Sequence, residues 1–270
     1  MELYNEDCLE RMKDISNNSI DLLFCDLPYG QTTCKWDCLI DLELFWKEVN
    51  RICKITCPMF FTCSTKFGVS LINSNPKNFR YDLVWVKSAS CGFLNAKKMP
   101  MKKHEMVYVF YRKLPLYDLS SHAHKFLKEQ VNPRKEKGAD TLYPNRCAVA
   151  TINKYDPPLP NSVIKTELYS SENKEEPREL YRNEGGQYDP PLPNTLLEIK
   201  SQKGKHSTQK PVELISHFLK YYSKENDTIL DPTMGSGSTG IACKNLNRKF
   251  IGIELNKDIF EVAKKRLNNE

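Results

Sequence analysis

A glycine-rich loop between a short apolar segment and a helical pattern limits what this chain can fold into. The loop runs from Asp231 to Gly240 and follows the apolar residues 227–231. Its glycines let the backbone approach a ligand closely, and the free N–H groups at the start of the next helix favour an anionic group. Glu254 ends the next apolar segment, where its carboxylate can accept hydrogen bonds from both hydroxyls of a ribose. Strand, loop, helix, strand and acid in this order predict a ligand that contains a nucleoside.

The remaining sequence supports an α/β fold, because short apolar or aromatic runs alternate with helical patterns at both ends of the chain. Strands are predicted at residues 2–5, 20–26, 59–63, 81–86, 106–111, 227–231 and 250–254. Helices are predicted at residues 8–14, 42–53, 211–223, 239–247 and 258–267. Strands this apolar are buried on both faces, which favours a doubly wound, mostly parallel sheet.

The middle of the chain follows a different pattern. Residues 113–205 are rich in proline, asparagine and charge, with weak periodicity, and we interpret them as an insertion between residues 1–112 and 206–270. The motif Tyr-Asp-Pro-Pro-Leu-Pro-Asn occurs in this region twice, at 155–161 and 188–194. Two copies are too few for a solenoid, so we interpret them as matching polyproline-like turns or docking loops.

Positive charge is concentrated around the start of this insertion. From Lys87 to Lys154 there are 14 Lys and Arg against 5 Asp and Glu, a net charge of +9 in a chain whose total is +6. A basic segment in a near-neutral scaffold is typical of a protein with a polyanionic partner. A solvated charged surface is the alternative explanation.

Ten cysteines could indicate disulfides or a metal site, but most of them lie inside apolar segments. We expect buried, reduced thiols and no metal, because Cys34/Cys38 and Cys53/Cys57 are not Cys-x-x-Cys pairs and no histidine is interleaved with them. No apolar run approaches membrane-spanning length, and the first residues lack the features of a signal peptide. We therefore expect a soluble, cytoplasmic protein without a membrane partner.

A second motif, Asp26-Leu27-Pro28-Tyr29, stands at the end of the predicted strand 20–26. A carboxylate and the neighbouring carbonyl can both accept hydrogen bonds from an exocyclic amino group, and a tyrosine ring can stack on a flat base. Pro28 stiffens the turn. On these four residues alone, the favoured interpretation is an ordinary Pro-Tyr turn at a strand end.

The glycine-rich loop leaves two ligand classes to compare. A nicotinamide dinucleotide needs a site for its second nucleotide and a residue that handles hydride, and the sequence has no second glycine fingerprint. S-adenosylmethionine needs one adenosine site and room for its aminocarboxylate, which a single unit of this kind can provide.

Together the two motifs resemble those of the amino-group DNA methyltransferases, which methylate adenine N6 or cytosine N4. The family patterns are Asp/Asn/Ser-Pro-Pro-aromatic and Asp-Pro-Phe-x-Gly-x-Gly, and the order found here, with a variable region between them, is similar to the β subgroup. The resemblance covers about two-thirds of the chain. It implies a Rossmann-like methyltransferase fold, S-adenosylmethionine as cofactor, and residues 113–205 as an inserted target-recognition region.

The resemblance also implies roles for the residues that match. Asp26 and the Leu27 carbonyl would accept hydrogen bonds from the target amino group, Pro28 would stiffen this loop, and Tyr29 would stack on a flipped base. The cofactor would contact Asp7 near its adenine, Glu254 at its ribose, Thr208 and Lys210 near its aminocarboxylate, and along its methionine part Asp231, Pro232, Thr233, Gly235, Ser236 and Gly237. Leu27 and Thr233 depart from the usual proline and phenylalanine, which puts the stiffness of the loop and part of the cofactor packing in doubt.

Double-stranded DNA is the partner that the resemblance implies, and reaching an amino group inside a duplex requires base flipping. Candidate phosphate contacts are Lys97, Lys98, Lys102, Lys103, Arg112, Arg134 and Lys135, with Lys113 and Arg146 as extensions. The first four flank Met99-Pro100-Met101 in a predicted loop. About half of these charges are expected to be ordinary surface charges.

Asp at position 26 favours adenine N6 as the target, since serine is commoner in the cytosine enzymes. The alternatives are cytosine N4 methylation and a non-catalytic module that binds nucleic acid on the same fold. A homodimer and a cognate restriction endonuclease are further partners compatible with the family. The recognition sequence cannot be read from the chain.

Overall fold

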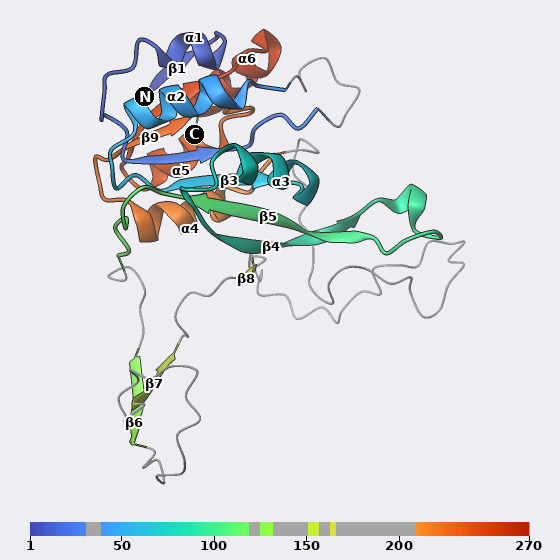
Figure 1. Ribbon diagram of the computed structural model, residues 1–270, viewed down its shortest axis with the longest axis vertical. Helices are drawn as coiled ribbons and strands as arrows, with labels where there is room; N and C mark the ends of the chain where they lie inside the picture. The colour runs from blue at the N-terminus through green and yellow to red at the C-terminus, as the bar shows by residue number, and fades with distance from the viewer. Residues whose placement is uncertain (31–38, 119–124, 132–150, 157–162, 166–208, 270) are drawn as a thin grey trace. The chain divides into compact units, whose positions relative to one another are not determined.

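The computed structural model describes residues 1–30, 39–118, 125–131, 151–156, 163–165 and 209–269 (Figure 1). The chain divides into two compact units, Met1–Asp118 with Ser162–Glu270, and Leu119–Asn161. In the smaller unit, β6 (Lys125–Val131) pairs antiparallel with β7 (Thr151–Asp156). The first repeat begins at the end of β7, whereas residues 157–161 and the second repeat lie outside the described residues. The target-recognition role of 113–205 stays a prediction.

The larger unit is built on an eight-stranded sheet. Its strands follow in the order β1 (Glu2–Tyr4), β10 (Lys249–Ile253), β9 (Thr228–Asp231), β2 (Leu22–Cys25), β3 (Met59–Cys63), β5 (Lys102–Phe110), β4 (Phe79–Cys91) and β8 (Val163–Lys165). β5 runs antiparallel to both of its neighbours, and the other neighbouring pairs are parallel. The predicted mostly parallel sheet is confirmed.

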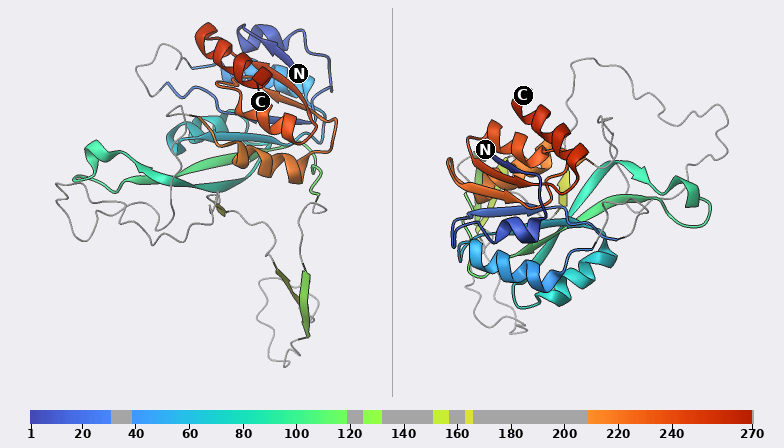
Figure 2. Two further views of the ribbon diagram at one scale, coloured as in Figure 1. Left: turned by 180° about the vertical axis from the view of Figure 1, so that it is seen from behind. Right: turned by 90° about the horizontal axis from the view of Figure 1, so that it is seen from above.

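Helices cover both faces of this sheet, and β2 shows why. Alternate side chains of a strand point to opposite faces: Leu23 and Cys25 join one buried cluster, and Leu22 and Phe24 join the other. The first cluster contains residues of α1 (Cys8–Met12), α2 (Leu42–Ile52) and α3 (Thr65–Ser74). The second contains residues of α4 (Val212–Tyr222), α5 (Ser238–Asn245) and α6 (Lys257–Asn269). The right-hand view of Figure 2 shows the blue helix α2 and the red helix α6 on opposite sides of the strands.

Every strand and helix that the sequence predicted is present, with ends that differ by a few residues. The prediction missed helix α3, the strands β6, β7 and β8, and the full length of β4 and β5. Helix α3 is capped by Ser64 and buries Phe67, Gly68 and Leu71, but its glycine, serines and asparagine weaken the helical pattern. β4 and β5 are longer than predicted and project together as a two-stranded arm (Figure 1). Lys102 and Lys103 therefore lie in β5 and not in the loop that the sequence predicted.

The described cysteines are free thiols, as predicted, and all but the exposed Cys91 are buried: Cys8, Cys25, Cys53, Cys57, Cys63 and Cys243. They pack as small apolar side chains in the two clusters. Among the described residues, no helix combines the length and apolar character needed to cross a bilayer.

Candidate active site

The two sequence motifs meet because their strands are neighbours. β2 and β9 pair in parallel, with Leu23 opposite Leu230, so the tetrapeptide after β2 and the glycine-rich loop after β9 leave the same edge of the sheet. In open α/β sheets this edge, at the carboxyl ends of the strands, is where ligands bind. A cavity of about 670 Å³ lies here, and both motifs line it.

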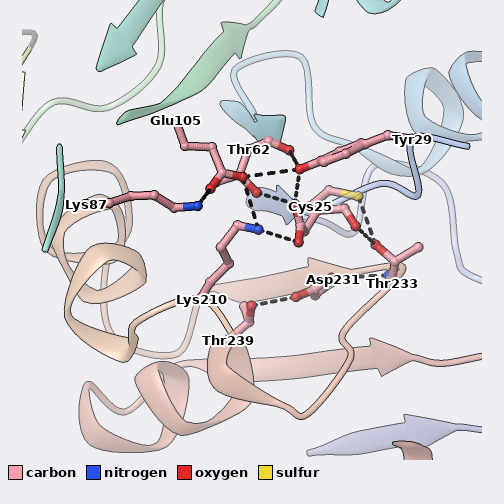
Figure 3. A network of polar contacts seen from close by, with 10 residues as sticks. Cys25, Tyr29, Thr62, Lys87, Glu105, Lys210, Asp231, Thr233 and Thr239 are labelled. Carbon is pink, nitrogen blue, oxygen red and sulfur yellow. Dashed lines mark hydrogen bonds and ion pairs between the residues drawn. The ribbon is translucent and has the colours of Figure 1, made fainter. Parts of the chain in front are cut away.

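Asp26 is the centre of a polar network in this cavity, and its partners Tyr29, Thr62 and Lys210 are labelled in Figure 3. Its Oδ1 accepts hydrogen bonds from the Tyr29 hydroxyl at 2.6 Å and from Thr62 Oγ1 at 2.7 Å. Its Oδ2 accepts from Lys210 Nζ at 2.6 Å. A carboxylate has about four acceptor positions. Three are occupied by these donors, which leaves one, on Oδ2, for a further N–H.

Tyr29 contributes its hydroxyl as well as its ring. The oxygen also lies 2.9 Å from the Thr62 carbonyl oxygen and 3.4 Å from Glu105 Oε1, and the ring packs against Phe67 with centroids 5.4 Å apart. Burial raises the pKa of Tyr29, and the negative charges of Asp26 and Glu105 raise it further, so the hydroxyl remains a donor. Stacking of this ring on a flipped base stays a prediction.

Lys210 links Asp26 to a second buried acid that the sequence did not reveal. Its Nζ lies 3.3 Å from Glu105 Oε1, and Glu105 Oε2 lies 3.1 Å from Lys87 Nζ. Lys87 and Glu105 come from β4 and β5, and Thr62 comes from β3. The available sequence signals were weak: Glu105 precedes the apolar run 106–111, and Lys87 follows the run 81–86. Charged residues at the ends of predicted strands are common, so these positions gave no specific prediction.

Thr233 connects the glycine-rich loop to the motif Asp26-Leu27-Pro28-Tyr29. Its Oγ1 donates to the Asp26 carbonyl oxygen at 3.0 Å and lies 3.4 Å from Cys25 Sγ. Asp231 is buried, and its carboxylate accepts from the Thr233 amide at 3.2 Å and from Thr239 Oγ1 at 2.5 Å. Burial raises the pKa of Asp231 to about 7, although these two hydrogen bonds oppose the rise. The two motifs therefore form one connected structure.

Glu254 directly follows β10 and contacts the glycine-rich loop. Its Oε2 accepts from the Gly235 amide at 3.0 Å and its Oε1 from the Asn256 amide at 2.8 Å. Burial raises the pKa of Glu254, while these amides and that of Leu255 lower it. Each oxygen keeps acceptor capacity for a ligand hydroxyl. Gly235 and Gly237 have φ of +53° and +82°, a conformation that glycine adopts without strain.

Most of the predicted site residues line the cavity. Some of their side chains also make hydrogen bonds within the protein. The described residues at its wall include Asp7, Asp26, Leu27, Pro28, Tyr29, Lys210, Asp231, Pro232, Thr233, Gly235, Ser236 and Glu254. Gly237 is the N-cap of α5 and is not among the lining residues. Asp7 also caps α1, with Oδ1 accepting from the Leu9 amide at 2.7 Å. Thr208 lies outside the described residues.

The predicted DNA contacts are scattered. Lys97 and Lys98 follow the short helix η1 (Phe93–Asn95) at the end of the β4–β5 arm. Arg112 instead donates to the carbonyl oxygens of Asn50 and Cys53 where α2 ends. Its guanidinium thus has a structural role, and a phosphate contact of Arg112 stays a prediction. Arg134, Lys135 and Arg146 lie outside the described residues.

Comparison with known proteins agrees with this geometry. A family model described as DNA methylase, N6_N4_Mtase, matches residues 20–265. The chain belongs to this DNA methylase family. The match includes both motifs and the region between them, so the resemblance drawn from the two motifs is confirmed.

Individual relatives of this chain are similar over different lengths. The Type II methyltransferase M2.LlaDCHI of Lactococcus lactis subsp. cremoris is 42% identical over 112 residues, which are 38% of this chain and 42% of that protein. M.HindIII of Haemophilus influenzae is 24% identical over 310 aligned positions, covering 99% of this chain and 95% of that protein. The crystal structure of an M1.HpyAVI–SAM complex has a TM-score of 0.57 and 23% identity, with 98% of this chain and 99% of that chain covered. The chain thus matches less than half the length of M2.LlaDCHI, and the likeness to M1.HpyAVI supports the methyltransferase fold.

Proposed function

We propose that this protein transfers a methyl group from S-adenosylmethionine to the exocyclic N6 of an adenine flipped out of double-stranded DNA. The observation that carries the proposal is the convergence of an amino-group acceptor motif and a nucleoside-binding loop on one cavity. Thr233 joins the two motifs through its hydrogen bond to the Asp26 carbonyl. The methyl donor and the target amino group would therefore meet at one edge of the sheet.

The wall of the cavity fits an adenosine-containing cofactor. Its volume of about 670 Å³ is in the usual range for small-molecule sites. Glu254 would bind the ribose hydroxyls, Asp7 would lie near the adenine, and Asp231 with the loop to Ser236 would contact the methionine part. When bound, S-adenosylmethionine supplies an electrophilic methyl group on a sulfonium. The complex of M1.HpyAVI with SAM supports this choice of cofactor.

The acceptor residues would activate and orient the amino nitrogen. The lone pair of an aryl amine is delocalised into the ring, so the amine is a poor nucleophile. Hydrogen bonds from its two protons to Asp26 Oδ2 and to the Leu27 carbonyl favour a tetrahedral nitrogen with a localised lone pair. The N–C bond forms as the S–C bond breaks with its electron pair on sulfur. The nitrogen then loses one proton through Asp26 to water, and the fixed carboxylate stabilises the developing positive charge.

The β4–β5 arm supports DNA as the substrate. Residues 92–103 contain four lysines and no acid, and Leu94 and Met99 are 94% and 60% exposed. Lysines contact phosphates, and exposed apolar side chains can enter a disturbed base stack. A cytoplasmic location is part of this proposal, because the protein would act on DNA held in that compartment. A homodimer and a cognate restriction endonuclease are compatible partners, to be tested by light scattering and by digestion of unmethylated host DNA.

Nucleoside mass spectrometry of plasmid DNA after incubation with S-adenosylmethionine tests the proposal. We expect N6-methyladenine with the native protein and none with Asp26→Ala, while Asp14→Ala, a change at a side chain that is 68% exposed, keeps activity. N4-methylcytosine would replace the adenine assignment with the cytosine alternative. Cofactor binding without label on any DNA would instead support a non-catalytic module.

A further inference from the structure

Four alternating charges run from the acceptor site into the sheet, in the order Asp26, Lys210, Glu105, Lys87. Successive charged atoms lie 2.6, 3.3 and 3.1 Å apart. The side chains of the two inner members, Lys210 and Glu105, are only 13% and 10% exposed. Each residue comes from a different segment: the loop after β2, the residues before α4, β5 and β4. The register that pairs Trp85 with Glu105 brings Lys87 close to this acid.

The burial of Lys210 and Glu105 shows that the charge of each depends on its neighbours. An unpaired buried charge is costly, so an isolated Lys210 would lose its proton. Burial does lower the pKa of Lys210, but Asp26 and Glu105 outweigh it and raise the pKa to about 12. Burial likewise raises the pKa of Glu105, and Lys210 with Lys87 lowers it below its usual value. The two inner members, Lys210 and Glu105, thus form a pair of opposite charges.

The contacts of Lys210 favour a role at the carboxylate of Asp26 over a role at the cofactor. An ammonium group has three N–H donors, and two of those on Lys210 are directed at Asp26 and Glu105. Together with Tyr29 and Thr62, Lys210 fixes both oxygens of Asp26 from three separate segments. The acceptor carboxylate cannot rotate without breaking one of these bonds, and its remaining acceptor position has a defined direction.

We propose that Lys210 is a positioning residue for the acceptor carboxylate, and that Glu105, neutralised in turn by Lys87, holds Lys210 in place. This inference rests on the proposed function and replaces the sequence-based assignment of Lys210 to the cofactor aminocarboxylate. Glu105 has a second effect during methyl transfer. The target nitrogen becomes positive close to Lys210, and Glu105 offsets the repulsion that an ammonium alone would exert.

Two measurements test the inference. Single-turnover methylation with preformed enzyme–cofactor–DNA complexes gives the rate of methyl transfer, and calorimetric titration with S-adenosylmethionine gives the cofactor Kd. Lys210→Met should lower the single-turnover rate about 100-fold, the scale of a misplaced reacting group, with cofactor Kd changed by less than about threefold. Lys210→Arg keeps the charge and should recover most of the rate. Glu105→Gln should lower the rate about 10-fold in the native background and have no further effect beside Lys210→Met, since it acts through that lysine.

The opposite pattern would overturn the inference. If Lys210→Met weakened cofactor binding and left the saturated rate unchanged, Lys210 would be a cofactor ligand. Additive effects of Lys210→Met and Glu105→Gln would show that the two residues act separately. Lys87→Met, which changes only the outer, partly exposed member of the series, supplies a milder variant if Lys210→Met unfolds, and an unchanged rate for it would remove Lys87 from the scheme. A native protein that methylates no DNA would refute the proposed function itself.

Discussion

The carboxyl group of Asp231 should make the free energy of unfolding fall as the pH rises. Asp231 is buried, and burial raises its pKa from the usual 3.8 to about 7. Between these two values the folded protein holds a proton that the unfolded chain has released. Because the folded state binds more protons, stability decreases with pH across this window and becomes constant above about pH 7. Asp231→Asn cannot ionise and should lack this contribution.

The size of the effect follows from the same pair of values. The rise from 3.8 to about 7 corresponds to roughly 4 kcal/mol at about 1.4 kcal/mol per pKa unit. An asparagine side chain at this position can keep the hydrogen bonds, since its oxygen can accept from the Thr233 amide and its NH2 can donate to Thr239, whose hydroxyl can reverse. Asp231→Asn should therefore match the native protein near pH 4 and become more stable than it by up to about 4 kcal/mol above pH 7.

Urea unfolding at half-unit steps from pH 4.5 to 8, followed by tryptophan fluorescence, measures this difference. The comparison cancels other titrating groups, including His217, whose pKa burial lowers to about 4 and whose contribution has the opposite sign. That contribution is present above the usual His pKa and is lost as the pH falls towards 4. Parallel stability curves for the native protein and Asp231→Asn would refute the reasoning, because they would mean that Asp231 ionises in the folded protein as it does in the unfolded chain. Asp14→Asn, a change at a side chain that is 68% exposed, serves as the control.

Three further changes test other parts of the site. Tyr29→Phe removes the hydroxyl 2.6 Å from Asp26 and should lower the single-turnover rate about 10-fold with cofactor affinity unchanged; an unchanged rate would show that this anchor is dispensable. Thr233→Val should cost about 1 kcal/mol in urea unfolding and slow methyl transfer, whereas Thr233→Ser should do neither; equal behaviour of the two variants would contradict a role for the hydroxyl. Lys98→Glu, on the arm, should weaken DNA binding and flatten its salt dependence by about one to two units in log–log slope, while Lys47→Glu on α2 should not; identical slopes would remove the arm from the DNA contact surface.

The fold could be predicted because its strands are nearly continuous apolar runs that need cover on both faces. That pattern located β2, β3 and β9 to within two residues. The apolar pattern did not predict strand segments whose side chains are polar. The outer part of β5 begins Lys102-Lys103-His104-Glu105 and pairs with β4 as an arm, so its polar residues show neither alternation nor an apolar run.

The chemistry of the site was predictable only in the two motifs that are continuous in sequence. Asp26 and Glu254 could be identified because each follows an apolar run at the place where a family pattern expects it. Thr62, Lys87 and Glu105 belong to the site through the register of β3, β4 and β5, which no local pattern specifies. Lys210 lies in a segment that the family resemblance identified. Its ion-pair partners, Asp26 and Glu105, could not be predicted, because they depend on which acids the folded sheet brings close to it.

Each of the two departures from the family motifs is matched by contacts of its own in this structure. Leu27 stands where the first proline is usual, and it is 3% exposed in the same apolar cluster as Phe45 and Trp46. Packing can therefore restrict this loop where the ring of a proline would have restricted it covalently. Thr233 replaces a phenylalanine and provides a hydroxyl that bonds to the Asp26 carbonyl, which an aromatic ring could not do. Because a stiffer acceptor loop and a bridge between the motifs both act on Asp26, Leu27→Pro should be tolerated in the native background and should partly restore methyl transfer to Thr233→Val; a double variant no faster than Thr233→Val would show that the two features act independently.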